Sequence, residues 1–501
     1  MTSGIDAHDS RLSKLRFVFA LCLVPFIALA TLNSGGYRYG ASDQAFYVPA
    51  ILKQLDPQLF PRDAPVLAAQ TRLMVSDEVI AAVARVTRVP LPAIFITLYG
   101  LTLALLAWSV WRIGLRLYSQ VWTAVALLAA FTLRHAIARS GTNTLEGYFH
   151  PRVMAFALGA AAVGLFLRKG IAAPLLLVAG ALALHPTTGL WFAVWLVTAT
   201  AIVHPSSRRP LALAAILAAA AGAWALVAGP LAGRLAIMDP EWRQMLESKD
   251  YLFPLQWPAY AWIINLGYLP VIASIFRLRA RAGVMDAYER ALVLGSSTLA
   301  VVFAGALVLH AAGVILAIQL QPARLFWMFD AIATIYAVWL IAEGSGPAAP
   351  GRARATALLL VCFSIARGAY VLVDAERPAL QISLPNDDWG RAMAFARSTS
   401  KNSGWLAHPL HAVLYGTSVR LAGERDVFVE AVKDTALGMY DRDIAVRTTR
   451  RLAAVPDFDA LTAAQARALA TQYGLDFIIT EQPMELPLAF ESGPLRVYRL
   501  E

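Results

Sequence analysis

SGGYRYGASDQAFYVPAILKQLDPQLFPRD, residues 34–63, decides where the rest of the chain is placed. The stretch directly follows the first hydrophobic segment and is too polar to cross a bilayer. It gathers polar and aromatic residues that a plain connecting loop does not need: Asp43, Tyr47, Asp56-Pro57 and Arg62-Asp63. We therefore interpret it as the first half of a functional site and place the other segments relative to it.

Composition assigns the chain to the membrane proteins. Of its 501 residues, 58% are hydrophobic and 15% are charged, well off the soluble average. Windows of about 18 or more nearly uncharged residues recur, and each can cross a hydrocarbon core of about 30 Å. The net charge of +10 is explained by basic loops and a basic tail, and we find no aromatic–basic module for nucleic acid. Cys22 and Cys362 lie in apolar segments, so neither a disulfide nor a thiolate metal site is expected.

The hydrophobic pattern predicts an α-helical polytopic membrane protein of about eleven spans with a C-terminal soluble α/β domain. Residues 1–373 are expected to form the transmembrane domain, with a long first outside loop at 34–90, and residues 374–501 the soluble domain. The expected spans are Leu15–Asn33, Leu91–Trp111, Val121–Ala138, Val153–Leu167, Ile171–Leu184, Leu190–Val203, Leu211–Gly233, Tyr260–Phe276, Ala291–Ile318, Leu325–Ala342 and Ala355–Val373.

Basic residues set the expected orientation. The segment RLRAR at 277–281 is hard to translocate, and basic residues are denser in the loops on its side. The N-terminus then lies in the cytoplasm and the C-terminal domain is periplasmic, in a bacterial inner membrane. The apolar run from Phe17 to Leu32 has no small-residue cleavage pattern, which favours an uncleaved signal anchor. The Gly/Pro/Ala stretch Gly344–Arg352 is expected to be a short cytoplasmic linker.

Two soluble regions have their own pattern. Asp43–Leu55 has apolar residues at helical spacing, which predicts an amphipathic helix along the membrane surface. In the tail, short apolar strands alternate with helices. The expected strands are Gly404–Tyr415, Phe428–Val432 and Phe477–Thr480, and the expected helices are Asp388–Arg397, Ala436–Ala453 and Ala460–Tyr473.

Asp43 is the first candidate for chemistry. Its carboxylate can deprotonate an acceptor hydroxyl or bind a divalent metal. The alternative is a plain helix-terminus role, because the helix dipole stabilises acids there. Asp56 and Asp63 are more readily explained as turn residues.

The remaining candidates fall on the same expected side of the membrane as Asp43. Glu146, His150 and Arg152 share one outside loop, and an Arg there suits phosphate binding while a His can donate a proton. His185 closes the fifth span, with an interfacial structural role as its alternative. Arg324 opens the tenth span as an anion-binding candidate, and the deeper Asp330 is interpreted as structural.

This layout resembles the GT-C membrane glycosyltransferases, which use polyprenyl-phosphate-linked sugars as donors. The segment SDQAFYVP looks like their first-loop acidic motif. The resemblance implies that Asp43 is catalytic, with Glu146 as the second acid, although Asp43 has no adjacent acid as many members do. It further implies that Arg324, Arg152, His150 and His185 bind the donor phosphate.

The function expected on this basis is transfer of a sugar, with inversion, to a glycan, lipid or protein acceptor outside the cytoplasm. The partners are the lipid-linked donor, that acceptor and membrane lipids. A transporter or flippase for a lipid-linked or anionic substrate is the first alternative, though no paired repeats are visible. A non-catalytic membrane assembly protein is the second.

Overall fold

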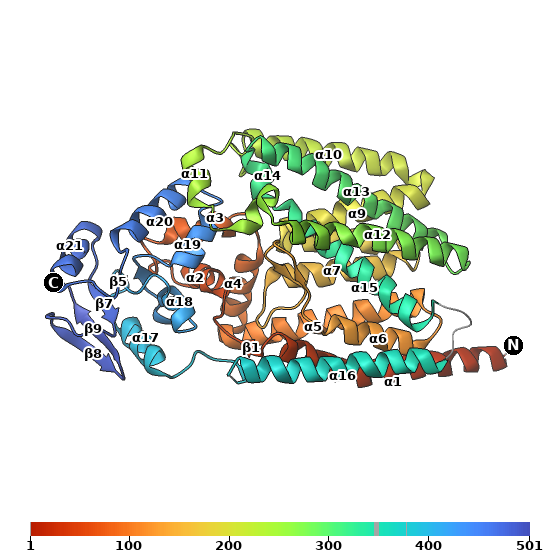
Figure 1. The fold of residues 1–501 in the computed structure, drawn as a ribbon, viewed down its shortest axis with the longest axis horizontal. Helices are drawn as coiled ribbons and strands as arrows, with labels where there is room; N and C mark the ends of the chain where they lie inside the picture. The colour runs from red at the N-terminus through yellow and green to blue at the C-terminus, as the bar shows by residue number, and fades with distance from the viewer. Residues whose placement is uncertain (1, 345–349, 377, 501) are drawn as a thin grey trace.

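The computed structural model of the chain describes residues 2–344, 350–376 and 378–500. A helical bundle makes up most of the molecule, and a smaller domain covers one of its ends (Figure 1). The N-terminus lies at the opposite end of the bundle from this domain. Residues 345–349 of the expected linker lie outside the described residues.

Eight helical segments in the described part of the chain are long and apolar enough to cross a membrane. This is a helical membrane protein. The helices of the bundle are α1 (Thr2–Asn33), α5 (Leu91–Leu117), α6 (Val121–Phe131), α7 (Pro151–Phe166), α8 (Ala172–Leu184), α9 (Pro186–Val203), α10 (Arg208–Val227), α12 (Ala259–Arg281), α13 (Ala287–Ala311), α14 (Ile315–Gln319), α15 (Phe326–Ala342) and α16 (Pro350–Asp374).

Three expected spans contain shorter apolar helices, α6, α7 and α8. Helix α6 has 11 residues, which at 1.5 Å per residue is about 16 Å, well short of a hydrocarbon core. The chain leaves the helix after Phe131 and forms a small hairpin of β2 (Ala136–Ile137) and β3 (Thr142–Asn143). The total of eleven spans therefore stays a prediction.

Residues 34–90, called the first outside loop after the expected orientation, contain three helices, α2 (Gln44–Leu55), α3 (Ala64–Thr71) and α4 (Ser76–Thr87). Helix α2 forms where expected, but it does not lie along the surface, because every residue from Gln44 to Ile51 is buried. The run Phe46–Ala50 is apolar at successive positions, so the helix has no polar stripe to present to solvent. It packs instead between the bundle and the C-terminal domain.

The C-terminal domain contains a five-stranded sheet in the order β6-β5-β7-β9-β8. Strand β5 pairs in parallel with β6 and β7, and β9 pairs antiparallel with β7 and β8. The strands are β5 (Gly404–Leu406), β6 (Asp426–Val427), β7 (Phe477–Thr480), β8 (Leu488–Ser492) and β9 (Leu495–Arg499). The helices are α17 (Asp388–Ser398), α18 (His411–Leu414), α19 (Ala431–Leu437), α20 (Arg442–Ala454) and α21 (Ala463–Tyr473).

Only part of the expected strand pattern is confirmed. Strand Phe477–Thr480 is as expected, but the strand expected at Gly404–Tyr415 ends at Leu406. Pro409 follows within three residues and cannot donate to a sheet ladder. The strand expected at Phe428–Val432 is wrong, because β6 ends at Val427 and α19 begins at Ala431.

The first outside loop and the C-terminal domain are joined by strand pairing and by a buried ion network. Strand β1 (Tyr37–Arg38) pairs in parallel with β4 (Leu380–Gln381). The Asp63 carboxylate is fully buried and accepts hydrogen bonds from Arg420 Nε at 2.7 Å and from the Val427 N–H at 3.0 Å. Asp63 lies in a turn, as expected, and its carboxylate also anchors the C-terminal domain. Asp56 accepts from Lys401 and from the Gln58 N–H, in keeping with a turn.

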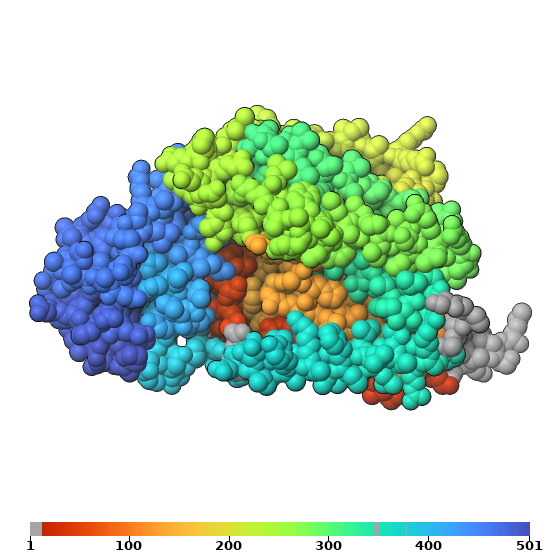
Figure 2. All heavy atoms as spheres, in the orientation of Figure 1, coloured from red at the N-terminus to blue at the C-terminus, as the bar shows by residue number. Residues whose placement is uncertain are grey.

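One face of the molecule is hollowed where the bundle meets the C-terminal domain (Figure 2). The hollow lies between α12, α16 and that domain, and residues from the first half of the bundle form its floor. The polar residues of the first outside loop therefore lie at the end of the bundle that the C-terminal domain covers.

Candidate active site

Asp43 lies directly before α2, and its side chain does not cap that helix. Its Oδ2 accepts a hydrogen bond from His150 Nε2 at 3.0 Å, and its Oδ1 accepts one from Lys433 of α19. The side chain keeps 27% of its surface exposed, so the carboxylate is not sealed in the core. Asp43 is at the N-cap position of α2, but its carboxylate is engaged by His150 and Lys433 rather than by the N–H groups of the helix.

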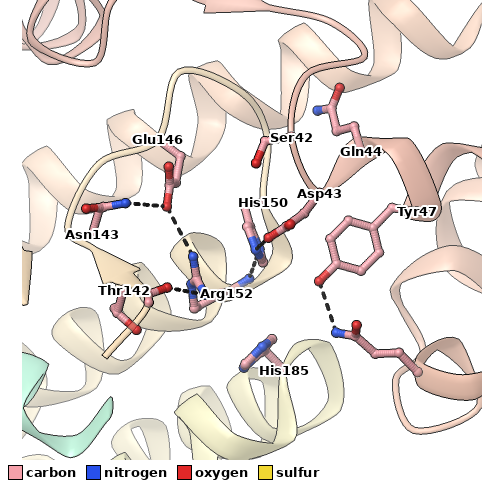
Figure 3. Close-up of polar contacts among 12 residues, drawn as sticks. Ser42, Asp43, Gln44, Tyr47, Thr142, Asn143, Glu146, His150, Arg152 and His185 are labelled. Carbon is pink, nitrogen blue, oxygen red and sulfur yellow. Dashed lines mark hydrogen bonds and ion pairs between the residues drawn. The ribbon is translucent and has the colours of Figure 1, made fainter. Parts of the chain in front are cut away.

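A hydrogen bond from a backbone N–H fixes the tautomer of His150. Its Nδ1 accepts a hydrogen bond from the Arg152 N–H at 3.0 Å, so the proton of the neutral ring must lie on Nε2. Burial and the nearby Arg152 guanidinium lower the pKa of His150 to about 4, against the opposing pull of Asp43. At neutral pH His150 is thus an uncharged ring that donates to Asp43 (Figure 3).

The charge on Asp43 follows from its two donors. Burial alone would raise its pKa, but Lys433 and His150 outweigh burial and hold the pKa of Asp43 well below its usual value. Asp43 is therefore ionised, and as long as both donors stay in place it is a weak base.

Glu146 lies beside Arg152 rather than beside Asp43. Its Oε1 accepts from Arg152 Nη2 and from Asn143 Nδ2, both at 3.1 Å (Figure 3). Glu146 and Arg152 are both buried, so each compensates the other's charge. In this arrangement Glu146 orients Arg152, whose Nη1 also donates to the Gly141 carbonyl at 3.2 Å.

His185 lies between α8 and α9 and is buried. Its Nδ1 accepts from the Thr188 N–H at 3.3 Å, which leaves the proton of the neutral ring on Nε2. Burial, followed by Arg324, lowers the pKa of His185 well below its usual value. Among the described residues nothing accepts from Nε2. Its ring centre is 6.3 Å from that of His150, and Figure 3 shows it facing the Asp43–Arg152 group.

A cavity of about 300 Å³ adjoins His185. Its wall is mainly apolar, formed by Leu73, Met74, Pro186, Pro230, Leu231, Leu316 and Leu320. Besides His185, the polar residues on it are Gln70, Arg72, Thr187, Gln319 and Tyr440. Such a wall suits a hydrocarbon chain next to a polar group.

Arg324 is a cation without a counter-ion. It lies on a 3₁₀ turn, η4 (Pro322–Leu325), directly before α15. Within the described ranges its guanidinium forms no hydrogen bond or ion pair, and its Nε is buried without a partner. Arg152, Tyr440 and Tyr251 are within electrostatic reach. A half-buried guanidinium of this kind is suited to an anionic ligand.

Asp330 does not neutralise Arg324. Its Oδ2 is 2.8 Å from His135 Nδ1, and its Oδ1 accepts from the Tyr268 hydroxyl at 3.2 Å. The structural role expected for Asp330 agrees with this pairing, with His135 as the partner. Arg324 is thereby left available for a ligand.

The residues around Asp43 do not fit a metal ion. Lys433 and His150 occupy its two oxygens, and the Arg152 guanidinium nearby would repel a cation. In the part of the chain that the structure describes, no three His, Cys, Asp or Glu side chains converge as metal ligands. We therefore derive no step through a metal.

Sequence reasoning missed the contribution of the C-terminal domain. Lys433 and Tyr440 reach the Asp43 group across almost four hundred residues of sequence separation. Lys433 lies outside the expected elements, and Tyr440 lies within the helix expected at Ala436–Ala453, but no motif assigned either residue to the site. That helix begins later than expected, at Arg442. The candidates Asp43, His150 and Arg152 do come together, with His185 and Arg324 beside them.

Fold and site together define a polytopic helical membrane protein with a charged, partly enclosed site under a C-terminal domain. No family model matches this sequence, and no curated protein is significantly similar to it.

Proposed function

We propose that the protein is a membrane glycosyltransferase that transfers a sugar from a polyprenyl-phosphate donor to an acceptor hydroxyl. The observation that carries this proposal is an ionised carboxylate, Asp43, in the same group as a guanidinium, Arg324, that has no counter-ion in the described chain. Arg152 and His185 are within electrostatic reach of both residues. The carboxylate of Asp43 can accept a proton, and the guanidinium of Arg324 can bind a phosphate. In the expected orientation the site faces the periplasm of a bacterial inner membrane.

The donor would bind on the Arg324 side. Arg324 would hold the phosphate, and His185 Nε2–H would supply a second donor. The apolar cavity beside His185 has room for the first units of the isoprenoid chain. Arg324 would stabilise the charge that gathers on the polyprenyl phosphate as its oxygen leaves the anomeric carbon.

The acceptor would attack the anomeric carbon from the other face of the sugar. As its oxygen forms the new glycosidic bond, the hydroxyl proton passes to Asp43, and the anomeric configuration is inverted. The hydroxyl would take the place of Lys433 on Oδ1, which removes one of the donors that weaken Asp43 as a base. His150 would keep the carboxylate oriented through Oδ2.

Two variants test this proposal in the full chain reconstituted in lipid nanodiscs. We expect Arg324→Gln to weaken binding of a short polyprenyl phosphate tenfold or more, since a hydrogen bond to a charged group contributes about 1.5–3 kcal/mol. We expect Asp43→Asn to keep that binding but to lower turnover by about 10²–10⁴ once a donor screen has found the sugar.

Arg450→Gln is the matched control, because Arg450 is exposed on the C-terminal domain. If Arg324→Gln binds polyprenyl phosphate as tightly as Arg450→Gln does, the donor site is wrong. If Asp43→Asn keeps full turnover, Asp43 is not the base.

A further inference from the structure

A second cavity lies on the other side of Asp43 from the donor groups. It has a volume of about 270 Å³ and lies between the first outside loop and the C-terminal domain. Ser42 and Lys433 line it, and Lys433 also contacts Asp43 and, at 3.4 Å, the Ser42 hydroxyl. Figure 3 shows Ser42 and His185 on either side of Asp43. The cavity thus adjoins the carboxylate that the donor cavity also approaches.

Glu430 on the wall of this cavity is a buried carboxyl with few hydrogen-bond donors in the described chain, of which the Ser418 hydroxyl is close enough to lower its pKa. Its residue is 1% exposed, and no described residue forms a hydrogen bond of normal geometry with Oε1 or Oε2. The nearest cation is Arg420 Nη1, 3.9 Å away. Arg420 is already engaged, because its Nη2 donates a hydrogen bond to Asp434 at 2.9 Å and its Nε donates one to Asp63 at 2.7 Å.

The pKa of Glu430 lies close to neutral pH. Burial raises the pKa of Glu430 to about 7, against the opposing effect of Arg420. A buried carboxyl with few donors is costly in any folded protein. A ligand whose groups donate to it would remove that cost.

Hydroxyl groups make up much of the remaining polar wall. Thr417 Oγ1 accepts from Trp389 Nε1 at 3.1 Å, so it keeps its own proton to donate. Ser418 Oγ accepts from the Leu421 N–H at 3.1 Å, and its hydroxyl lies next to the Glu430 carboxyl. Gly416 lies at the wall with φ +77 and open space where a Cβ would be. At about 30 Å³ per water, the cavity holds roughly nine waters, which is ample for one sugar ring.

The charges exclude other small ligands. An anion would meet Glu430, while the two cations on the wall, Lys433 and Arg38, already have interaction partners. A cation would meet Lys433 and Arg38. A hydrocarbon would bring no hydrogen-bond donor to the Glu430 carboxyl. An uncharged molecule with several hydroxyl groups satisfies all of these side chains.

We propose that this cavity binds one neutral sugar residue, with Glu430 accepting hydrogen bonds from its hydroxyl groups. Its role as the acceptor pocket rests on the proposed glycosyl transfer, since only then does the adjoining Asp43 take a proton from the bound sugar. The binding itself requires no donor. Specificity for the acceptor therefore lies in the C-terminal domain, at Glu430, Thr417 and Ser418.

The test is saturation-transfer NMR with a panel of methyl glycosides of common hexoses, on the full chain in nanodiscs without donor. We expect saturable binding of at least one glycoside, weakened tenfold or more in Glu430→Gln. Val413→Trp should abolish it, because Val413 lines the cavity and is 65% exposed, so the larger ring closes the mouth without disturbing the core. Glu485→Gln, an exposed site in the same domain, is the control and should bind like the wild type.

The two proposals fail separately. If no glycoside binds the wild type, or if Glu430→Gln and Val413→Trp both bind normally, the sugar pocket is wrong even where Arg324 still binds polyprenyl phosphate. If glycosides bind as expected but polyprenyl phosphate binding does not depend on Arg324, the pocket stands and the donor site fails. Arg324→Gln should leave glycoside binding unchanged.

Discussion

Replacing Arg420 should release the C-terminal domain from the first outside loop. Arg420 is 1% exposed and holds Asp63 of the loop and Asp434 of α19, with Glu430 3.9 Å away. Arg420→Met would leave these carboxyls buried, with Arg447 as the remaining cation on Asp63. Breaking a buried ion network by removing one partner costs about 3–5 kcal/mol.

Amide hydrogen exchange of residues 426–434 measures this change directly. The Val427 N–H donates to Asp63, and the Glu430 N–H donates to Asp434 at 3.0 Å, so both amides depend on the network. Where amide exchange follows the opening equilibrium, a loss of about 3–5 kcal/mol in opening free energy makes exchange about 10²- to 10^3.5-fold faster. Arg420→Lys keeps the charge without the planar fork and should give a smaller increase.

Arg450→Met, at an exposed site in the same domain, controls for the loss of a positive charge. If the 426–434 amides exchange no faster in Arg420→Met than in this control, the ion network does not hold the domain to the loop. Faster exchange throughout the bundle would also contradict this role of the network, because the variant would then have unfolded the protein as a whole.

Two further predictions concern the site. Glu146→Gln should destabilise the protein by about 3–5 kcal/mol, because it leaves Arg152 buried without its counter-ion. Turnover per folded molecule should stay within tenfold of the wild-type value. A far larger fall would show that Glu146 is catalytic. His150 lowers stability as the pH falls from 6.5 to about 4, because the unfolded chain binds a proton in that window and the folded chain does not. His150→Gln should therefore lose less stability between pH 7 and 5 than the wild type, by about 2 kcal/mol. Equal losses in an unfolding titration would contradict the neutral state of His150, since buried His411 contributes alike to both proteins.

The sequence was most informative where one physical force dominates. Long apolar runs form helices where they were expected, although several are shorter than predicted, and β7 and α17 also lie at the expected positions. Prediction failed where tertiary contacts decide. The hairpin of β8 and β9 was not predicted although each strand has 5 residues. Helix α2 was predicted, but its burial was not, because it depends on docking of the C-terminal domain.

The candidate site divides in the same way. Ionisable residues near expected span ends can be found from sequence, because charge is costly in a membrane, and this selected Asp43, His150, Arg152 and Arg324. The interaction partners of these residues could not be predicted from the sequence. Whether Asp330 pairs with His135 or with Arg324 depends on helix rotation, and Lys433 reaches Asp43 only after the C-terminal domain has docked.

Two groups near Asp43 are left unsatisfied by the protein itself, and they have opposite signs. Arg324 has no counter-ion, and Glu430 has few donors in the described chain. A phosphate at Arg324 would bring negative charge toward Asp43 and so raise its pKa, because like charges disfavour ionisation. An acceptor hydroxyl in place of Lys433 would raise it further, since Lys433 is the strongest of the groups that lower it. Asp43 would thus become an effective base only when both substrates are bound, which protects the donor from hydrolysis while the acceptor pocket is empty.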